Sequence, residues 1–299
     1  MMEDPKDIIR QLRKIELTTG ILVEGLQSGI HHSLFRGRGM EFDGIREYMA
    51  GDDVRAIDWN VTARLNRPFI KEYTEERDQT FYFVVDVSGS GLFGSTVSKQ
   101  KKILEVTASL AFAALRNNDR IGLCLFSDRV EKFIPAKRGR RHLISILNTL
   151  AFHTPQSPGT DPDCALRFLA NSIPRRSSFI ILSDFTPSPP GRSLGVLVHR
   201  HEVVAIRVTD PREQEIPDIG SVELEDAETG EQVLVNTSDP LFRRRFAASV
   251  IAYERDLSRM FTKQGTRYIS LRTTDPYEIP LSRFFRDGKA RRAAHGRIF

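Results

Sequence analysis

The stretch that most constrains the fold is residues 81–91, Phe-Tyr-Phe-Val-Val-Asp-Val-Ser-Gly-Ser-Gly. Its first five residues are apolar and favour β structure, which is typical of a strand buried on both faces. Asp86, Ser88 and Ser90 follow at alternate positions, and Gly89 allows a sharp turn after the strand. Their hard oxygen atoms are ligands suited to Mg²⁺ or Mn²⁺. The same pattern is also compatible with a polar turn that binds no metal.

Helices and strands are expected to alternate after this stretch. We expect helices over residues 98–116, 141–150, 164–171, 194–199 and 241–263, and strands over residues 121–126, 129–134, 179–182, 202–208 and 268–271. This alternation predicts an α/β fold with a mostly parallel sheet flanked by helices on both faces. In such sheets ligands bind at the carboxyl ends of strands, where the strand order reverses.

Two more polar residues lie in loops that could contribute ligands to such a site. Thr160 lies in a loop before an expected helix, and Asp184 ends the apolar run 179–182. Together with Asp86, Ser88 and Ser90, and in the same order, they resemble the metal-ion-dependent adhesion site of von Willebrand factor A domains. The resemblance implies a von Willebrand factor A-like, Rossmann-type sheet in which the strands before Asp86 and Asp184 are neighbours. It also implies that these five residues hold Mg²⁺ or Mn²⁺.

Residues 41–76 are dense in acidic, arginine and aromatic residues. We expect charge-assisted hydrogen bonds between arginines such as Arg46 and acids such as Asp52, with Tyr48 and Trp59 packed beneath and a strand over residues 67–72. The pattern resembles the signature of a bacterial family known as domain of unknown function 58, and the likeness extends over nearly the whole chain. It is carried by Tyr48, residues 51–55, residues 57–59, Ala63, Arg64, Glu75 and Glu76.

These observations predict three parts. Residues 1–77 form an N-terminal helix, expected over residues 6–27, and a small β-containing lobe with the family signature. Residues 78–286 form the von Willebrand factor A-like domain, and residues 287–299 form a basic tail. A hairpin insertion over residues 220–236 has its turn near Glu228. It either lies at the rim of the metal face or caps a sheet edge.

The charge distribution argues against specific nucleic-acid binding. The net charge is +5, but residues 1–282 hold 38 basic and 38 acidic residues, so the excess lies at the C-terminus. No apolar run approaches the length of a membrane span, and the first residues lack signal-peptide character. Cys124 and Cys164 fit neither a zinc pattern nor a disulfide framework. We therefore expect a cytoplasmic protein.

The expected site has few charged ligands and leaves a coordination position for an outside carboxylate. We therefore expect a non-catalytic, metal-dependent protein-interaction module whose partner supplies an acidic residue. The resemblance implies a MoxR-type AAA+ ATPase as that partner, acting in the assembly or maturation of client complexes. One alternative is a metal-dependent hydrolase at the same site, although helix capping explains Asp161 equally well. Another is weak binding of an anionic surface by the tail.

Overall fold

The computed structural model describes residues 40–49, 52–75, 79–226 and 228–285. The helix expected over residues 6–27 and the basic tail 287–299 lie outside these residues. The chain divides into two compact units: Phe35–Asp78 is one, and the described residues from Gln79 onward belong to the other. Each unit is described by itself.

The small unit is a two-stranded antiparallel sheet with one short helix. Strand β1 (Met40–Glu47) pairs with β2 (Phe69–Glu75), and the 3₁₀ helix η1 (Val54–Ala56) and helix α2 (Trp59–Leu65) lie between them in sequence. Asp58 begins α2 because its side chain accepts hydrogen bonds from two backbone amides of the first turn. The Arg46 guanidinium contacts both carboxylate oxygens of Asp52, at 2.7 and 2.8 Å. The charge-assisted pairing expected for these two residues is therefore confirmed.

The expected burial of Trp59 is wrong. Its side chain is 66% exposed, whereas Ile70 of β2 is 6% exposed. Trp59 is the first residue of α2, directly after the capping Asp58, and this position leaves the indole facing solvent. The sequence interpretation also missed β1 and α2 as regular elements, since the charged and aromatic residues of residues 41–64 show no clear period.

The large unit is built on a six-stranded sheet with the order β10-β7-β6-β3-β4-β5. Neighbouring strands run parallel, apart from β5, which pairs antiparallel with β4 at one edge. The strands are β3 (Thr80–Asp86), β4 (Arg120–Phe126), β5 (Val130–Lys137), β6 (Ser178–Ser183), β7 (Glu202–Thr209) and β10 (Arg267–Arg272). The chain proceeds from β3 to β4 on one side and returns to β6 on the other, so the order reverses between β3 and β6.

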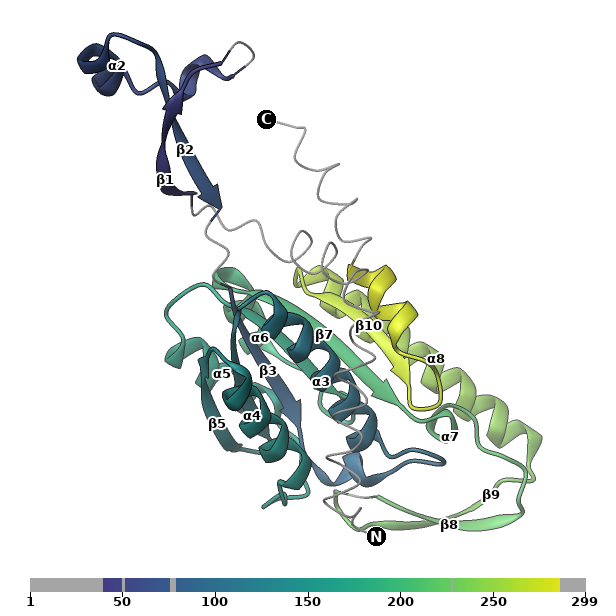
Figure 1. Cartoon of the computed structure of the whole chain (residues 1–299). Coiled ribbons are helices and arrows are strands. Elements are labelled where there is room, and N and C mark those ends of the chain that lie inside the picture. The colour runs from purple at the N-terminus through teal and green to yellow at the C-terminus, as the bar shows by residue number, and fades with distance from the viewer. Residues whose placement is uncertain (1–39, 50–51, 76–78, 227, 286–299) are drawn as a thin grey trace. The chain divides into compact units, whose positions relative to one another are not determined.

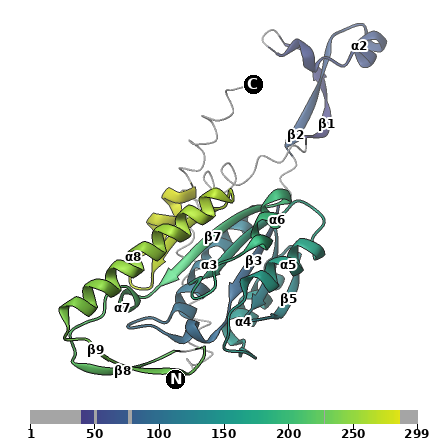
Figure 2. The same cartoon turned by 180° about the vertical axis from the view of Figure 1, so that it is seen from behind.

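Helices cover both faces of this sheet. They are α3 (Lys99–Arg116), α4 (Arg140–Phe152), α5 (Pro162–Ser172), α6 (Arg192–Arg200), α7 (Pro211–Gln214) and α8 (Pro240–Lys263), and a short 3₁₀ helix, η2 (Gly89–Leu92), follows β3. One face buries Tyr82, Val84 and Ile181 against α5, α6 and α8. Residues at alternate positions, such as Phe83, face the opposite side. Helix α3 packs there with α4; it lies in front of the sheet in Figure 1, and α8 lies in front in Figure 2.

The predicted α/β fold, with a mostly parallel sheet flanked by helices, is confirmed. The expected hairpin is also present, as β8 (Ser221–Glu225) and β9 (Gln232–Asn236). These strands form a sheet of their own and do not pair with a strand of the large sheet. Within the described residues, no helix combines the length and apolar character needed to cross a membrane.

Candidate metal centre

Three loops bring the five predicted residues to the carboxyl ends of two adjacent strands. Asp86 is the last residue of β3, and Ser88 and Ser90 lie directly after it, at the start of η2. Asp184 follows β6, which pairs with β3, and Thr160 precedes α5. The five residues therefore gather where the strand order reverses, because the carboxyl ends of parallel strands meet at one edge of the sheet.

The first three residues form a tightly hydrogen-bonded turn. The Ser88 amide donates to Asp86 Oδ1 at 2.9 Å, and the hydroxyl oxygens of Ser88 and Ser90 lie 3.2 Å apart. The hydroxyl of Ser183, at the end of β6, donates to Asp86 Oδ2 at 2.6 Å. Both carboxylate oxygens of Asp86 thus accept hydrogen bonds, which fixes its orientation. Asp86 is 7% exposed, Ser88 3% and Asp184 6%, so these three predicted ligands are buried.

Backbone hydrogen bonds hold the Thr160 loop against this turn. The Gly89 amide donates to the Pro158 carbonyl at 2.9 Å, and the Asp161 amide donates to the Ser127 carbonyl, after β4, at 2.9 Å. The Asp161 side chain caps α5 by accepting from the Asp163 amide. Asp163 Oδ1 in turn accepts from the amide of Gly191 at 2.9 Å. Asp161 and Asp163, the two acids that follow Thr160, therefore both have structural hydrogen bonds.

Asp184 is paired with a lysine that sequence reasoning missed. Lys99 Nζ, at the start of α3, lies 2.5 Å from Asp184 Oδ2 and 2.6 Å from Glu213 Oε1. The Thr186 amide donates to the other oxygen, Asp184 Oδ1, at 3.0 Å. Burial disfavours the charged form of Lys99, but the charges of Asp184 and Glu213 outweigh this and raise its pKa. Both carboxylate oxygens of Asp184 already have hydrogen-bond partners. We therefore expect a water molecule to lie between Asp184 and a metal.

The hairpin contributes a second residue that was not predicted as part of the site. Glu228, in the turn between β8 and β9, accepts a hydrogen bond from the Thr160 hydroxyl, and the two oxygens are 2.7 Å apart. Of the two positions left open for the hairpin, this contact supports the rim of the metal face. No local sequence signal links Glu228 to Thr160, which lies 68 residues earlier in the chain.

The site concentrates negative charge in a buried position. Burial and then the nearby Asp184 charge raise the pKa of Asp86 to about 6, despite the hydrogen bonds from Ser183 and Ser88 that favour its charged form. Burial also raises the pKa of Glu228, with a further contribution from Asp184. A bound cation would offset this repulsion between carboxylates.

The hydroxyl and carboxylate oxygens that converge here are of the kind that Mg²⁺ and Mn²⁺ prefer as ligands. In the structure they are hydrogen-bonded to one another, since the Ser88 and Ser90 hydroxyl oxygens are 3.2 Å apart and the Thr160 hydroxyl donates to Glu228 at 2.7 Å. Within the described residues, no group of three or more His, Cys, Asp or Glu side chains is arranged to hold a metal ion. Any site at this edge therefore depends on hydroxyl oxygens.

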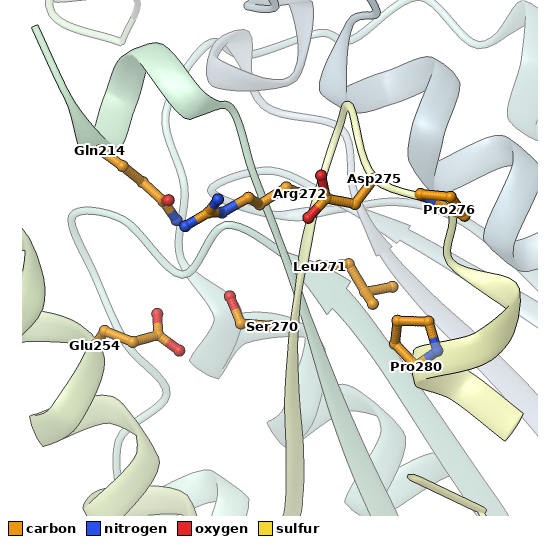
Figure 3. Close-up of a pocket in the computed structure, with 8 residues that line it drawn as sticks. All are labelled: Gln214, Glu254, Ser270, Leu271, Arg272, Asp275, Pro276 and Pro280. Atoms are coloured by element: carbon orange, nitrogen blue, oxygen red, sulfur yellow. The ribbon is translucent and has the colours of Figure 1, made fainter. Parts of the chain in front are cut away.

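A separate pocket of about 270 Å³ lies at the β10 edge of the sheet. Its lining comes from α7, α8, β10, the turn after β10 and the helical residue Pro280, and the side chains of Arg272 and Gln214 extend toward one another there (Figure 3). Glu254, in the same lining, is bound by the side chains of Arg207 and Tyr268. The pocket shares no residue with the five predicted metal ligands.

Comparison with known proteins places the chain among bacterial relatives. An uncharacterized protein of Mycobacterium tuberculosis is 37% identical over 289 residues, which cover 95% of this chain and 90% of the relative. Comparison with solved structures found the conserved hypothetical protein BatB from Bacteroides thetaiotaomicron, with a TM-score of 0.47 and 16% identity over 71% of this chain and 99% of that chain. An aerotolerance-related membrane protein from Bacteroides fragilis has a TM-score of 0.46 and 16% identity over 70% of this chain and 99% of that chain.

The family comparison agrees with the signature read from the sequence. The model of the family described as "Protein of unknown function DUF58" matches residues 44–256. This match includes most of the small unit and the sheet strands β3 to β7, together with the five predicted metal ligands. The chain therefore belongs to the DUF58 family.

Proposed function

We propose that this protein is a non-catalytic, divalent-metal-dependent protein-interaction module of the cytoplasm, built on a von Willebrand factor A-like domain. In this proposal Asp86, Ser88, Ser90, Thr160 and Asp184 hold Mg²⁺ or Mn²⁺ as a metal-ion-dependent adhesion site. The observation that carries the proposal is the convergence of these side chains at the carboxyl ends of β3 and β6. There the Ser88 and Ser90 hydroxyl oxygens lie 3.2 Å apart, beside the carboxylate of Asp86 at the end of β3 and that of Asp184 after its neighbour β6.

A cation held by these residues would supply a Lewis-acidic position for a carboxylate of the partner. The chain's own residues orient that position. Asp86 is held by Ser183 and by the Ser88 amide, and Lys99 holds Asp184 in place. We propose a MoxR-type AAA+ ATPase as the partner, acting with this protein in the assembly or maturation of client complexes.

The hydrogen bonding of the site favours recognition over catalysis. The Ser88 and Ser90 hydroxyls contact each other, and in the part of the chain that the structure describes neither is paired with a histidine or lysine base. Lys99 is occupied by Asp184 and Glu213. A hydrolase would need a nucleophile or a water held by a base beside the metal.

A Mn²⁺ titration monitored by electron paramagnetic resonance tests the metal site. We expect about one Mn²⁺ per chain, strongly weakened binding in Ser90→Ala, and loss of binding in Asp86→Asn. Asp128→Asn is the matched control, because Asp128 lies near the end of β4 but pairs with Arg129 at 2.8 Å. Circular dichroism establishes that each variant is folded. Equal Mn²⁺ affinity in the parent and in folded Asp86→Asn would refute the ligand assignment.

A pull-down with the candidate ATPase tests the partner. We expect it to be retained in Mg²⁺ and released by EDTA, and Ser90→Ala should behave as EDTA does. Deletion of residues 287–299 should leave the metal dependence unchanged. Binding that survives EDTA but is lost on this deletion would instead identify the tail as the interaction site.

A further inference from the structure

We propose that Glu228 is an internal acidic ligand of the metal site, and that the hairpin of residues 220–236 blocks the site until a partner carboxylate displaces it. This inference rests on the proposed function. It deepens that function by identifying a residue of the chain itself that takes the partner's position.

The hairpin is an arm with little packing of its own. Its strands form an isolated two-stranded sheet, and its apolar side chains are largely exposed, with Val233 at 50% and Leu234 at 75%. Figure 1 shows β8 and β9 passing across the end of the large unit toward which β3 and β7 point. At its base, the buried Thr237 hydroxyl donates to the Gly220 carbonyl at 2.7 Å. The arm is thus fixed at its base, and little apolar burial holds the rest.

The turn of the hairpin is built to present Glu228. Asp226 Oδ1 accepts hydrogen bonds from the amides of Glu228 and Thr229, each at 2.8 Å. The Gly230 amide donates to the Asp226 carbonyl at 2.8 Å, and Gly230 adopts a φ of +72°, which favours glycine. These contacts are internal to the turn, so they set the direction of Glu228 independently of the metal site.

The Glu228 carboxylate reaches one of the proposed metal ligands directly. Its Oε1 accepts a hydrogen bond from the Thr160 hydroxyl, and the two oxygens are 2.7 Å apart. Thr160 is 9% exposed, so the Glu228 carboxylate reaches its hydroxyl in a nearly buried position. The proposed function assigns to a partner a carboxylate that binds the metal. Glu228 is a carboxylate of the chain itself that lies beside one of the proposed ligands, Thr160.

Two features make this contact reversible. The contact itself is polar, and the arm that carries it buries little apolar surface, so a partner carboxylate can replace it without unfolding the sheet domain. While Glu228 is in place it fills the open coordination position, which lowers the affinity for an external acid. The hairpin is therefore an autoinhibitory element whose release accompanies partner binding.

Water proton relaxation of the Mn²⁺-loaded protein tests the assignment directly, because it counts the water molecules bound to the ion. We expect Glu228→Ala to bind one Mn²⁺ with a higher relaxivity than the parent, by the contribution of one added water. Acetate should lower the relaxivity of the variant and leave that of the parent unchanged. Glu231→Ala is the matched control, since Glu231 lies in the same turn with an exposed side chain and should behave as the parent.

The outcomes separate this inference from the function on which it rests. If the parent binds no Mn²⁺, the proposed metal site itself is refuted. If both proteins bind Mn²⁺ with equal hydration, the metal site stands and Glu228 is not its ligand. As a second readout, Glu228→Ala should bind the candidate ATPase in Mg²⁺ about fivefold more tightly or better, within the usual range of coupling between sites. Weaker binding would overturn the blocking role, because Glu228 would then be a contact for the partner.

Discussion

Replacing Lys99 by methionine tests the charge balance on which the candidate site depends. Lys99 is 2% exposed and contacts Asp184, which is 6% exposed, at 2.5 Å. Methionine keeps a similar length and a similar helix propensity at this first position of α3, so the substitution removes little besides the charge and its hydrogen bonds. The carboxylates of Asp184 and Glu213 then lose the ammonium group that both of them contact.

The expected cost follows from the burial of the pair. Removing one partner of a buried ion pair costs about 3–5 kcal/mol, because an uncompensated charge is left behind. Glu213 is 32% exposed and can regain water, so most of this cost falls on Asp184. Removing a cation from a helix N-terminus returns about 0.3–1 kcal/mol, which is too small to offset the loss. For a unit of this size, the result is a melting temperature lower by roughly 6–20 °C.

The assay is urea and thermal unfolding of the parent and Lys99→Met in EDTA, followed by the same measurement in excess Mn²⁺. If the metal site is present, Mn²⁺ should restore part of the loss, by about 2.7 kcal/mol at a concentration 100 times the Kd. Lys132→Met is the control, because Lys132 is exposed on β5. A loss below about 1 kcal/mol in EDTA would refute the reasoning that Lys99 balances a buried carboxylate.

Four further substitutions test other parts of the structure. In urea unfolding, Trp59→Ala should change the free energy of unfolding by no more than about 0.5 kcal/mol, because the indole is exposed. Ile70→Ala, at a buried position of the same unit, should cost about 2–5 kcal/mol. A loss above about 0.5 kcal/mol for Trp59→Ala would mean that the indole is covered. Ser183→Ala should lower stability by about 1–3 kcal/mol in the same assay, because it removes the 2.6 Å hydrogen bond to buried Asp86, and an unchanged midpoint would contradict that bond's role. Burial lowers the pKa of His201, so below about pH 6.5 the unfolded chain binds more protons than the folded one and stability falls. Melting curves between pH 5 and 8 should therefore show a smaller drop in melting temperature for His201→Asn than for the parent. An equal drop in both proteins would contradict the assignment.

The sequence alone predicted the class of the fold, which the structure confirms, and the residues of the candidate site. Residues 81–85 are apolar without interruption, which requires burial on both faces, and such strands occur in parallel sheets covered by helices. Asp86, Ser88 and Ser90 were recognised because a motif at a strand end is local in sequence. Thr160 and Asp184 were added by the resemblance to a known site. The strands β3 and β6 are indeed adjacent, as that resemblance implied.

Only the tertiary structure decided what surrounds these residues. Lys99 pairs with Asp184 across 85 positions of the chain, and Glu228 reaches Thr160 across 68. A lysine in the first turn of a helix and a glutamate in a hairpin turn are ordinary surface residues by sequence, so nothing local marks either one. Trp59 is the opposite case, since its apolar side chain suggested burial and its place after a helix cap left it exposed. Sequence patterns report which face of an element is apolar, whereas the charges that meet at a strand end depend on how separate elements pack together.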